Sequence, residues 1–237
     1  MENYSFLEWD SNFFQKKIAK ITDINNLLNE EVNEILEILK SKKYNLVYFF
    51  SKKERNSFDK ILKKYNGKIL DKKVTYLKTM SKRDILSSEI VKYKLNYPTN
   101  DLIKLAIDAG IYSRFNIDEN IKKYKFEELY KNWIINSVNK SIAKDVLVYN
   151  YKNKIIAMVT LGEKNNIADI GIIAVNENFR GKGIGKKLIL SAENWAIENN
   201  FKKLQVVTQK DNINACKFYE NSGYKISKTE YIYHFWL

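Results

Sequence analysis

The sequence predicts an α/β fold built around a mixed sheet. Short apolar or alternating segments, typical of strands, alternate along the chain with segments whose apolar residues recur at helical spacing. The 237 residues are 45% hydrophobic, enough for one large domain or two small ones with a packed core. One proline, eight glycines and 14% aromatic residues exclude collagen-like, low-complexity and wholly disordered chains.

The predicted order before residue 81 is strand, helix, strand, helix, strand. In residues 27–40, Val32, Ile35 and Leu39 lie on one helical face together with Leu28 and Leu36. The apolar run at residues 44–51 suits a buried strand. A helix is predicted at 58–65, stopped by Asn66-Gly67, and strand-like sequence follows at 68–80.

A polar segment at residues 81–89, SKRDILSSE, is the candidate domain boundary. No Gly/Ser/Pro-rich linker and no internal repeat is visible. We therefore predict a small N-terminal α/β region at residues 1–85 and a second domain at residues 86–237.

The order of elements changes after this boundary. Asn100 is a plausible N-cap and Gly110 a stop for the first helix. A hairpin is predicted around residues 151–153. The predicted helices are 100–109, 126–140, 183–199 and 213–222, and the predicted strands are 145–150, 154–161, 168–175, 203–209, 224–227 and 229–237.

The strongest local feature is a strand that runs into a glycine-rich helix start, Arg180-Gly181-Lys182-Gly183-Ile184-Gly185. The first turn of a helix offers unpaired N–H groups and a partial positive charge, and glycines allow a ligand to approach the backbone closely. The basic residues of this loop add positive charge. The segment is therefore a candidate pyrophosphate site, although it matches neither a Walker A loop nor a dinucleotide-binding fingerprint.

Two motifs in the right order resemble those of the GCN5-related N-acetyltransferases. The first is Arg-x-x-Gly-x-Gly after a strand ending in Ala-Val, and the second is Asn212-x-x-Ala-x-x-x-Tyr219-x-x-x-Gly-Tyr224. The resemblance covers roughly the C-terminal 140 residues. It implies an acyl-CoA-dependent N-acetyltransferase with a mixed, mostly antiparallel sheet flanked by helices, acetyl-CoA as co-substrate and no metal.

The resemblance also implies roles for individual residues. The strand at 168–175 is expected to splay from its neighbour and to bind the pantetheine arm through its backbone. Tyr219 is expected to protonate the departing CoA thiolate, and the N–H of Val175 is the candidate oxyanion donor. The expected cofactor-binding residues are Ile173, Ala174, Val175, Arg180, Gly181, Lys182, Gly183, Ile184, Gly185, Lys186 and Asn212.

A narrower resemblance is to the bacterial dTDP-fucosamine acetyltransferases. It rests on the opening LEWDSNFFQKKIAKI, on SRFNID followed by LYKNWIINSV, and on Trp236-Leu237, with Gln15 where glycine is expected. It implies a nucleotide-linked amino-deoxy sugar as acceptor and a place in cell-surface polysaccharide biosynthesis. Arg114 and Phe115 are then candidate substrate-binding residues. Arg114 could hold the diphosphate of the acceptor, and an aromatic residue of this loop could stack on its nucleobase.

Other residues have weaker claims to a catalytic role. Asp169, the acidic residue of strand 168–175, is a candidate base, with a solvent-linked water chain as the favoured alternative. The single histidine, His234, and the single cysteine, Cys216, cannot supply the usual ligand set of a zinc site. Structural roles are favoured for both.

The formal charge of +13 comes from 41 lysines and arginines against 28 carboxylates, scattered along the chain. This favours a solvated basic surface over a nucleic-acid partner, since no nucleic-acid-binding motif is present. Three alternatives stay open. The first is an acetyltransferase that acts on a protein N-terminus, on a lysine or on another small-molecule amine. The second is a non-catalytic acyl-CoA-binding module, and the third is a nucleic-acid binder. A cytoplasmic enzyme without a membrane span is expected, and a homodimer is possible.

Overall fold

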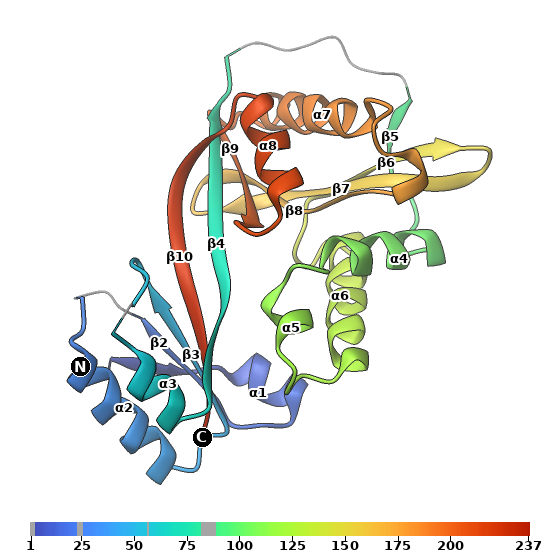
Figure 1. The fold of residues 1–237 in the computed structure, drawn as a ribbon. Coiled ribbons are helices and arrows are strands. Elements are labelled where there is room, and N and C mark those ends of the chain that lie inside the picture. The colour runs from blue at the N-terminus through green and yellow to red at the C-terminus, as the bar shows by residue number, and fades with distance from the viewer. Residues whose placement is uncertain (1–2, 23–25, 56, 82–88) are drawn as a thin grey trace. The chain divides into compact units, whose positions relative to one another are not determined.

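The computed structural model describes residues 3–22, 26–55, 57–81 and 89–237, and its chain divides into two compact units (Figure 1). Unit 1 contains residues 1–74 and 229–237, and unit 2 contains residues 75–228. The predicted boundary at residue 85 lies outside the described residues. The two compact units divide within two long strands, at Val74/Thr75 and Lys228/Thr229.

The elements of the N-terminal part begin with a strand, a helix and a strand that were not predicted individually. In chain order the elements are β1 (Tyr4–Phe6), α1 (Glu8–Phe14), β2 (Ile18–Thr22), α2 (Asn29–Ser41), β3 (Leu46–Ser51), α3 (Asp59–Lys64) and β4 (Gly67–Thr79).

The later elements follow the predicted order closely. They are β5 (Ile90–Lys92), α4 (Asn100–Ala109), α5 (Arg114–Ile117), α6 (Lys123–Val138), β6 (Asp145–Tyr151), β7 (Lys154–Lys164), β8 (Ile167–Val175), η1 (Glu177–Phe179), α7 (Ile184–Glu198), β9 (Lys203–Gln209), α8 (Ile213–Asn221) and β10 (Lys225–Trp236).

Three local predictions need correction. Helix α6 begins at Lys123, three residues earlier than predicted, and Lys122 at its N-cap position provides no side-chain cap that could have marked the start. The N-cap position of α4 is Thr99 and not Asn100, and the Thr99 side chain makes no capping hydrogen bond. The two predicted C-terminal strands are one continuous strand, β10, because the sequence has no Gly, Pro, Asn or Asp between Lys225 and Trp236.

Unit 1 pairs its strands in the order β1-β2-β3-β10. β1 is antiparallel to β2, β2 is parallel to β3, and β3 is antiparallel to β10. The apolar face predicted for residues 27–40 is buried in α2 at Val32, Ile35, Leu36 and Leu39, but Leu28, at the N-cap position, is 64% exposed. The buried face packs with α3 side chains on Val47, Phe49, Tyr233 and Phe235.

Unit 2 has the strand order β4-β9-β8-β7-β6-β5. The pairs from β5 to β8 are antiparallel, whereas β8 and β9 are parallel, so the sheet is mixed and mostly antiparallel as predicted. Helices α4 and α6 cover one face with a core that includes Leu105, Ile134 and Met158, and α7 lies on the other face (Figure 1).

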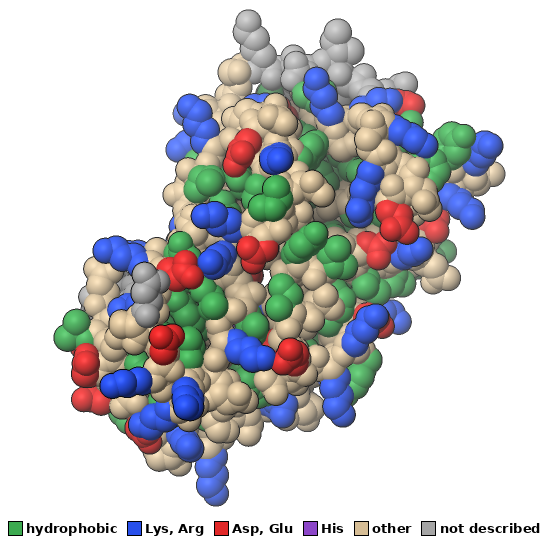
Figure 2. Space-filling model, in the orientation of Figure 1, with side chains coloured by type: hydrophobic (Ala, Val, Ile, Leu, Met, Phe, Trp, Pro, Cys, Tyr) green, Lys and Arg blue, Asp and Glu red, His purple; other side chains and the backbone are tan. Residues whose placement is uncertain are grey.

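The basic residues are distributed over the surface. Figure 2 shows lysine and arginine side chains spread over the visible face and interspersed with carboxylates. Ion pairs such as Lys64–Glu37 and Lys144–Glu163 use part of this charge. The view agrees with the predicted solvated surface on the face that it shows.

Candidate functional site

The most distinctive feature of unit 2 is a divergence of two parallel strands. The register of β8 with β9 runs from Ala168↔Leu204 to Ile170↔Val206 and ends there. β8 nevertheless continues to Val175 and β9 to Gln209. The carboxyl ends of the two strands therefore separate, which is the splay predicted for this segment.

A bulge in β8 lies where the strands part. Val159 pairs with Ile173 and Leu161 with Ile170, so Gly171 and Ile172 together oppose the single residue Thr160. The buried Oγ1 of Thr160 accepts a hydrogen bond from the Ile172 N–H at 2.8 Å. A Cβ on Gly171 would lie 2.9 Å from the same oxygen, so the bulge requires glycine there.

The bulge leaves alternate backbone groups of β8 pointing away from β7. The Asn176 N–H donates to Ile156 O at 2.8 Å, which makes residues 174 and 176 the hydrogen-bonded positions toward β7. The N–H and C=O groups of Ile173 and Val175 therefore face the gap, as predicted. Arg180 Nε donates to Val175 O at 3.0 Å, so one of these groups is already used.

The glycine-rich loop joins β8 to α7 through the short helix η1. Gly181 and Gly183 have φ values of +75° and +78°, a region that favours glycine, and Gly183 is the N-cap of α7. A Cβ on either residue would meet nothing within 4 Å. The loop is open to solvent, and the first N–H groups of α7 lack intrahelical partners, so an anion can approach them.

Helix α8 lies against this loop. A Cβ on Gly185 would be 3.3 Å from the Phe218 ring and 4.0 Å from Val175 Cγ2. The end of β8, the start of α7 and α8 therefore meet at one place. Asn212 caps α8, with its Oδ1 accepting from the Ala215 N–H at 3.2 Å, which leaves its side-chain amide group as a donor.

Tyr219 is 4% exposed and lies among aromatic rings. Its ring centroid is 5.6 Å from that of Tyr76 and 6.1 Å from that of Tyr224. Burial, reinforced by the neighbouring Cys216 thiol group, raises the pKa of the Tyr219 phenol above its ordinary value. No described residue accepts a hydrogen bond from its hydroxyl.

Sequence reasoning missed Tyr76, which lies in the strand-like segment 68–80. Its hydroxyl donates to Glu220 Oε1 at 2.7 Å. The sequence predicted only that residues 68–80 are strand-like, and it did not single out Tyr76. Nothing in the sequence indicated which helix it would contact, because its partner is more than a hundred residues away.

The weaker candidates occupy structural positions. Asp169 Oδ1 accepts from Gln205 Nε2 at 2.8 Å across the paired part of β8 and β9. His234 is fully buried with its ring 4.5 Å from that of Tyr48. Cys216 is partly exposed, and its Sγ lies 3.6 Å from Gln209 O. None of the described residues form a cluster of three or more potential metal ligands.

The two predicted substrate-binding residues lie in α5. The Arg114 guanidinium stacks 4.4 Å over the Phe115 ring. Phe115 is only 7% exposed and makes an edge contact with Trp133 at 6.2 Å. The Phe115 ring is therefore part of the core.

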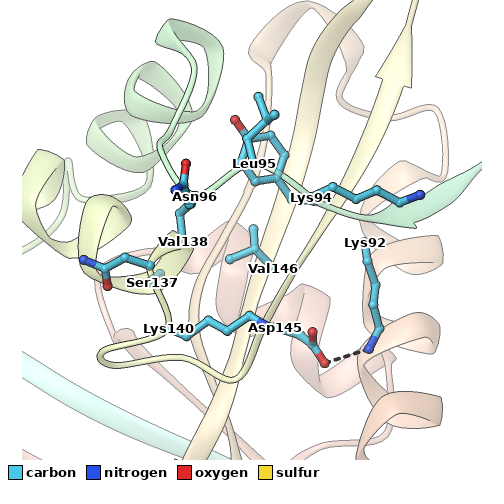
Figure 3. Close-up of a pocket in the computed structure, with 11 residues that line it drawn as sticks. Lys92, Lys94, Leu95, Asn96, Ser137, Val138, Lys140, Asp145 and Val146 are labelled. Atoms are coloured by element: carbon cyan, nitrogen blue, oxygen red, sulfur yellow. Dashed lines mark hydrogen bonds and ion pairs between the residues drawn. The ribbon is translucent and has the colours of Figure 1, made fainter.

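A separate pocket of 460 Å³ lies at the β5 edge, between residues 92–96 and the end of α6 (Figure 3). Lys92, Lys94 and Lys140 contribute to its wall. Asp145 Oδ2 is bound by Lys92 Nζ at 2.9 Å and by Trp195 Nε1 at 2.6 Å. β6 and β7 separate this edge from β8, and no predicted site residue lines the pocket.

Comparison with known proteins decides the family. The model of the acetyltransferase (GNAT) family matches residues 110–224. Streptothricin acetyltransferase A of Bacillus subtilis (strain 168) is 31% identical over 126 residues, which are 53% of this chain and 72% of that protein. The chain belongs to the GNAT acetyltransferase family.

Two other relatives are named for carbohydrate chemistry. The spore coat polysaccharide biosynthesis protein SpsD of B. subtilis (strain 168) is 23% identical over 138 residues, 58% of this chain and 47% of that protein. The dTDP-fucosamine acetyltransferase of Escherichia coli O6:H1 (strain CFT073) is 34% identical over 104 residues, 43% of this chain and 44% of that protein. The chain thus aligns with less than half the length of each.

Solved structures show the same fold. A conserved protein of unknown function from Staphylococcus epidermidis has a TM-score of 0.70 at 14% identity, over 99% of this chain and 91% of that one. A GCN5-related N-acetyltransferase from Sphaerobacter thermophilus has a TM-score of 0.57 at 11% identity, over 98% and 75% of the two chains.

Family membership identifies the chemistry of the GNAT domain as acyl-CoA-dependent N-acetyl transfer, with acetyl-CoA as donor. The divergent strands and the open glycine-rich loop suit such a donor, because an amide-bearing arm can pair with a strand edge and a diphosphate can bind a helix start. Within the described part of the chain, no helix has the length and apolar character to span a bilayer.

Proposed function

We propose that the protein transfers an acetyl group from acetyl-CoA to the amine of a nucleotide-linked amino-deoxy sugar, of the dTDP-4-amino-4,6-dideoxyhexose type. The observation that supports the transfer chemistry is the gap between the diverging ends of β8 and β9. The glycine-rich loop and α8 lie beside this gap. The similarity to a dTDP-fucosamine acetyltransferase supports the acceptor class.

In this proposal the donor is held along the edge of β8. Ile173 and Val175 offer backbone groups to the pantetheine arm, with Ala174 between them, and Asn212 offers its side-chain amide group near the thioester end. The diphosphate lies on residues 180–186, where the N–H groups at the start of α7 meet the basic side chains. Arg180 then exchanges its contact with Val175 O for one with the ligand.

The transfer is a direct displacement. The neutral amine attacks the thioester carbonyl carbon, a C–N bond forms, and the oxyanion receives a hydrogen bond from the Val175 N–H. The C–S bond then breaks, and the Tyr219 proton moves to the sulfur. The amine loses its extra proton to a chain of water molecules, and the phenolate is reprotonated from solvent. Asp169 is a poor candidate for the base because its carboxylate already binds Gln205.

The deciding experiment measures thiol release from acetyl-CoA with dTDP-4-amino-4,6-dideoxyhexoses, beside streptothricin, other small amines and peptides. Turnover on the sugar nucleotide is expected. Turnover on peptides alone would reject the proposed acceptor, and acetyl-CoA binding without turnover on any amine would favour a binding module.

A second candidate acceptor is another small-molecule amine of the streptothricin type. The match to streptothricin acetyltransferase A of B. subtilis covers 72% of that protein. Preferential turnover of streptothricin in the same panel would select this alternative.

Arg114 is proposed to hold the diphosphate of the acceptor. Replacing it by alanine is expected to raise the KM for the sugar nucleotide about tenfold or more, since charge-assisted pairs contribute roughly 1.5–3 kcal/mol. The KM for acetyl-CoA should change little. Equal effects on both substrates in steady-state kinetics would reject this role.

A further inference from the structure

Tyr76 is a buried residue of β4 that lies outside the region matched by the family model, which begins at residue 110. It is 1% exposed. Its ring lies against that of Tyr219, with centroids 5.6 Å apart and planes inclined by 43°. A strand from the N-terminal part of the sequence therefore supplies the surface on which Tyr219 packs.

The hydroxyl of Tyr76 makes a second contact with the same helix. It donates to Glu220 Oε1 at 2.7 Å, and Glu220 follows Tyr219 in α8. Consecutive residues of a helix point about 100° apart, so one contact at each fixes both the position and the rotation of this turn. Burial, with Glu220 and Cys216 alongside, raises the pKa of the Tyr76 phenol far above its usual range, so the donor stays protonated.

Lys78 extends this attachment two residues further along β4, on the same face of the strand. Its Nζ lies 2.7 Å and 2.8 Å from the two carboxylate oxygens of Glu193 in α7. It also lies 5.5 Å over the Tyr224 ring, just after α8. β4 thus holds α8 through Tyr76 and ties the following turn to α7 through Lys78.

We propose that Tyr76 is a positioning residue for acetyl transfer, which holds Tyr219 in line with the departing sulfur. This inference rests on the proposed role of Tyr219 as the acid. When the C–S bond breaks, the Tyr219 proton must reach the sulfur across one hydrogen bond. A displacement of about 1 Å can cost roughly a hundredfold in rate, so a fixed helix rotation matters for kcat.

The test combines two substitutions in the full chain. Tyr76→Phe keeps the ring and removes the hydrogen bond to Glu220. It is expected to lower kcat about tenfold and to leave the KM for acetyl-CoA nearly unchanged. In the Tyr219→Phe background the same substitution is expected to have no further effect on kcat, because that background lacks the hydroxyl proton that Tyr76 would position.

Three further variants separate positioning from structure. Glu220→Gln keeps an acceptor for the Tyr76 hydroxyl and should retain kcat, whereas Glu220→Ala should behave like Tyr76→Phe. Tyr65→Phe is the matched control, because Tyr65 is also buried and its hydroxyl also donates to a glutamate, Glu37, at 2.6 Å in unit 1. It should leave kcat unchanged. Thermal unfolding of each variant shows whether it is folded.

Rates are measured as acetyl-CoA consumption with each amine of the panel, and as acetyl-CoA hydrolysis where no amine is accepted. The positioning role is overturned if Tyr76→Phe lowers kcat by the same factor in the unaltered protein and in Tyr219→Phe. It is also overturned if Tyr65→Phe lowers kcat as much as Tyr76→Phe does. A full kcat for Tyr76→Phe beside an impaired Tyr219→Phe overturns it too. An unimpaired Tyr219→Phe instead rejects the proposed acid, and with it the premise.

Discussion

At the residue scale, the phenol of Tyr219 combines burial with an uncommitted hydroxyl. Desolvation disfavours the phenolate, so the proton is held to a higher pH than in an exposed tyrosine. A phenol that stays protonated throughout the neutral range is an acid in the correct state for donation to a thiolate.

The first prediction concerns this proton. Tyr219→Phe is expected to lower kcat by roughly 10²–10⁴-fold, the usual contribution of a positioned general acid. The raised pKa also means that kcat of the unaltered protein should not fall between about pH 7 and pH 10 through loss of the Tyr219 proton. The measurement is kcat against pH at saturating acetyl-CoA. An alkaline decline below about pH 10 that disappears in Tyr219→Phe would contradict it.

At the element scale, the bulge in β8 is stabilised by one side-chain hydrogen-bond acceptor, the hydroxyl of Thr160. Thr160 Oγ1 replaces the backbone partner that the Ile172 N–H loses at the bulge. The bulge lies immediately after the last pair that β8 makes with β9. The geometry of the donor site thus depends on a buried hydroxyl of the neighbouring strand.

Thr160→Val should therefore destabilise the fold and weaken donor binding. Valine has nearly the same shape but leaves the Ile172 N–H without an acceptor, which costs about 1–3 kcal/mol. Urea unfolding gives the loss of stability, and calorimetric titration with acetyl-CoA gives the loss of affinity. Thr160→Ser keeps the oxygen and is the control. Equal behaviour of the valine and serine variants would show that the hydroxyl is not required.

The start of α7 depends on a left-handed backbone conformation that few residue types adopt easily. Gly183 caps the helix at a φ of +78°. Gly183→Val is expected to raise the KM for acetyl-CoA about tenfold, because the left-handed conformation costs a non-glycine residue roughly 1–2 kcal/mol and distorts the loop. Gly183→Asn, which tolerates this conformation, should change the KM less. An unchanged KM for the valine variant would argue against diphosphate binding here.

At the scale of the whole molecule, the sheet of unit 2 is not made from a contiguous segment. β4 lies between β9 and β10 in the strand order, and its residues from Thr75 onward belong to unit 2. The Met80 N–H also donates to Lys202 O at 2.9 Å. A cut near residue 85 removes β4, the strand that neighbours β9, from the unit that carries the donor site.

Residues 86–237 expressed alone are therefore expected to be insoluble or only partly folded. The loss of β4 exposes the edge of β9 and uncovers Tyr219, and exposed strand edges promote aggregation. Co-expression with residues 1–85 should restore soluble protein, because the missing strand can then pair. Solubility and circular dichroism are the measurements. A stable, acetyl-CoA-binding fragment 86–237 would show that β4 is dispensable.

Local sequence was sufficient to predict the fold class, the helices α2, α4, α7 and α8, the hairpin of β6 and β7, and the position of the glycine-rich loop. These follow from local periodicity and from residues with special backbone freedom, such as Gly181 and Gly183 at positive φ. The motif from Asn212 to Tyr224 likewise marked α8 correctly, since a helix cap and a glycine stop are local features.

Which strands pair with one another became clear from the folded structure. The place of β4 beside β9, the contact of Tyr76 with Tyr219 and the bulge held by Thr160 depend on residues far apart in the chain. Strand pairing and ring packing are determined by the burial of whole faces, and local sequence does not encode the partner. The same reason explains why Phe115, an apparent loop residue, is committed to the core.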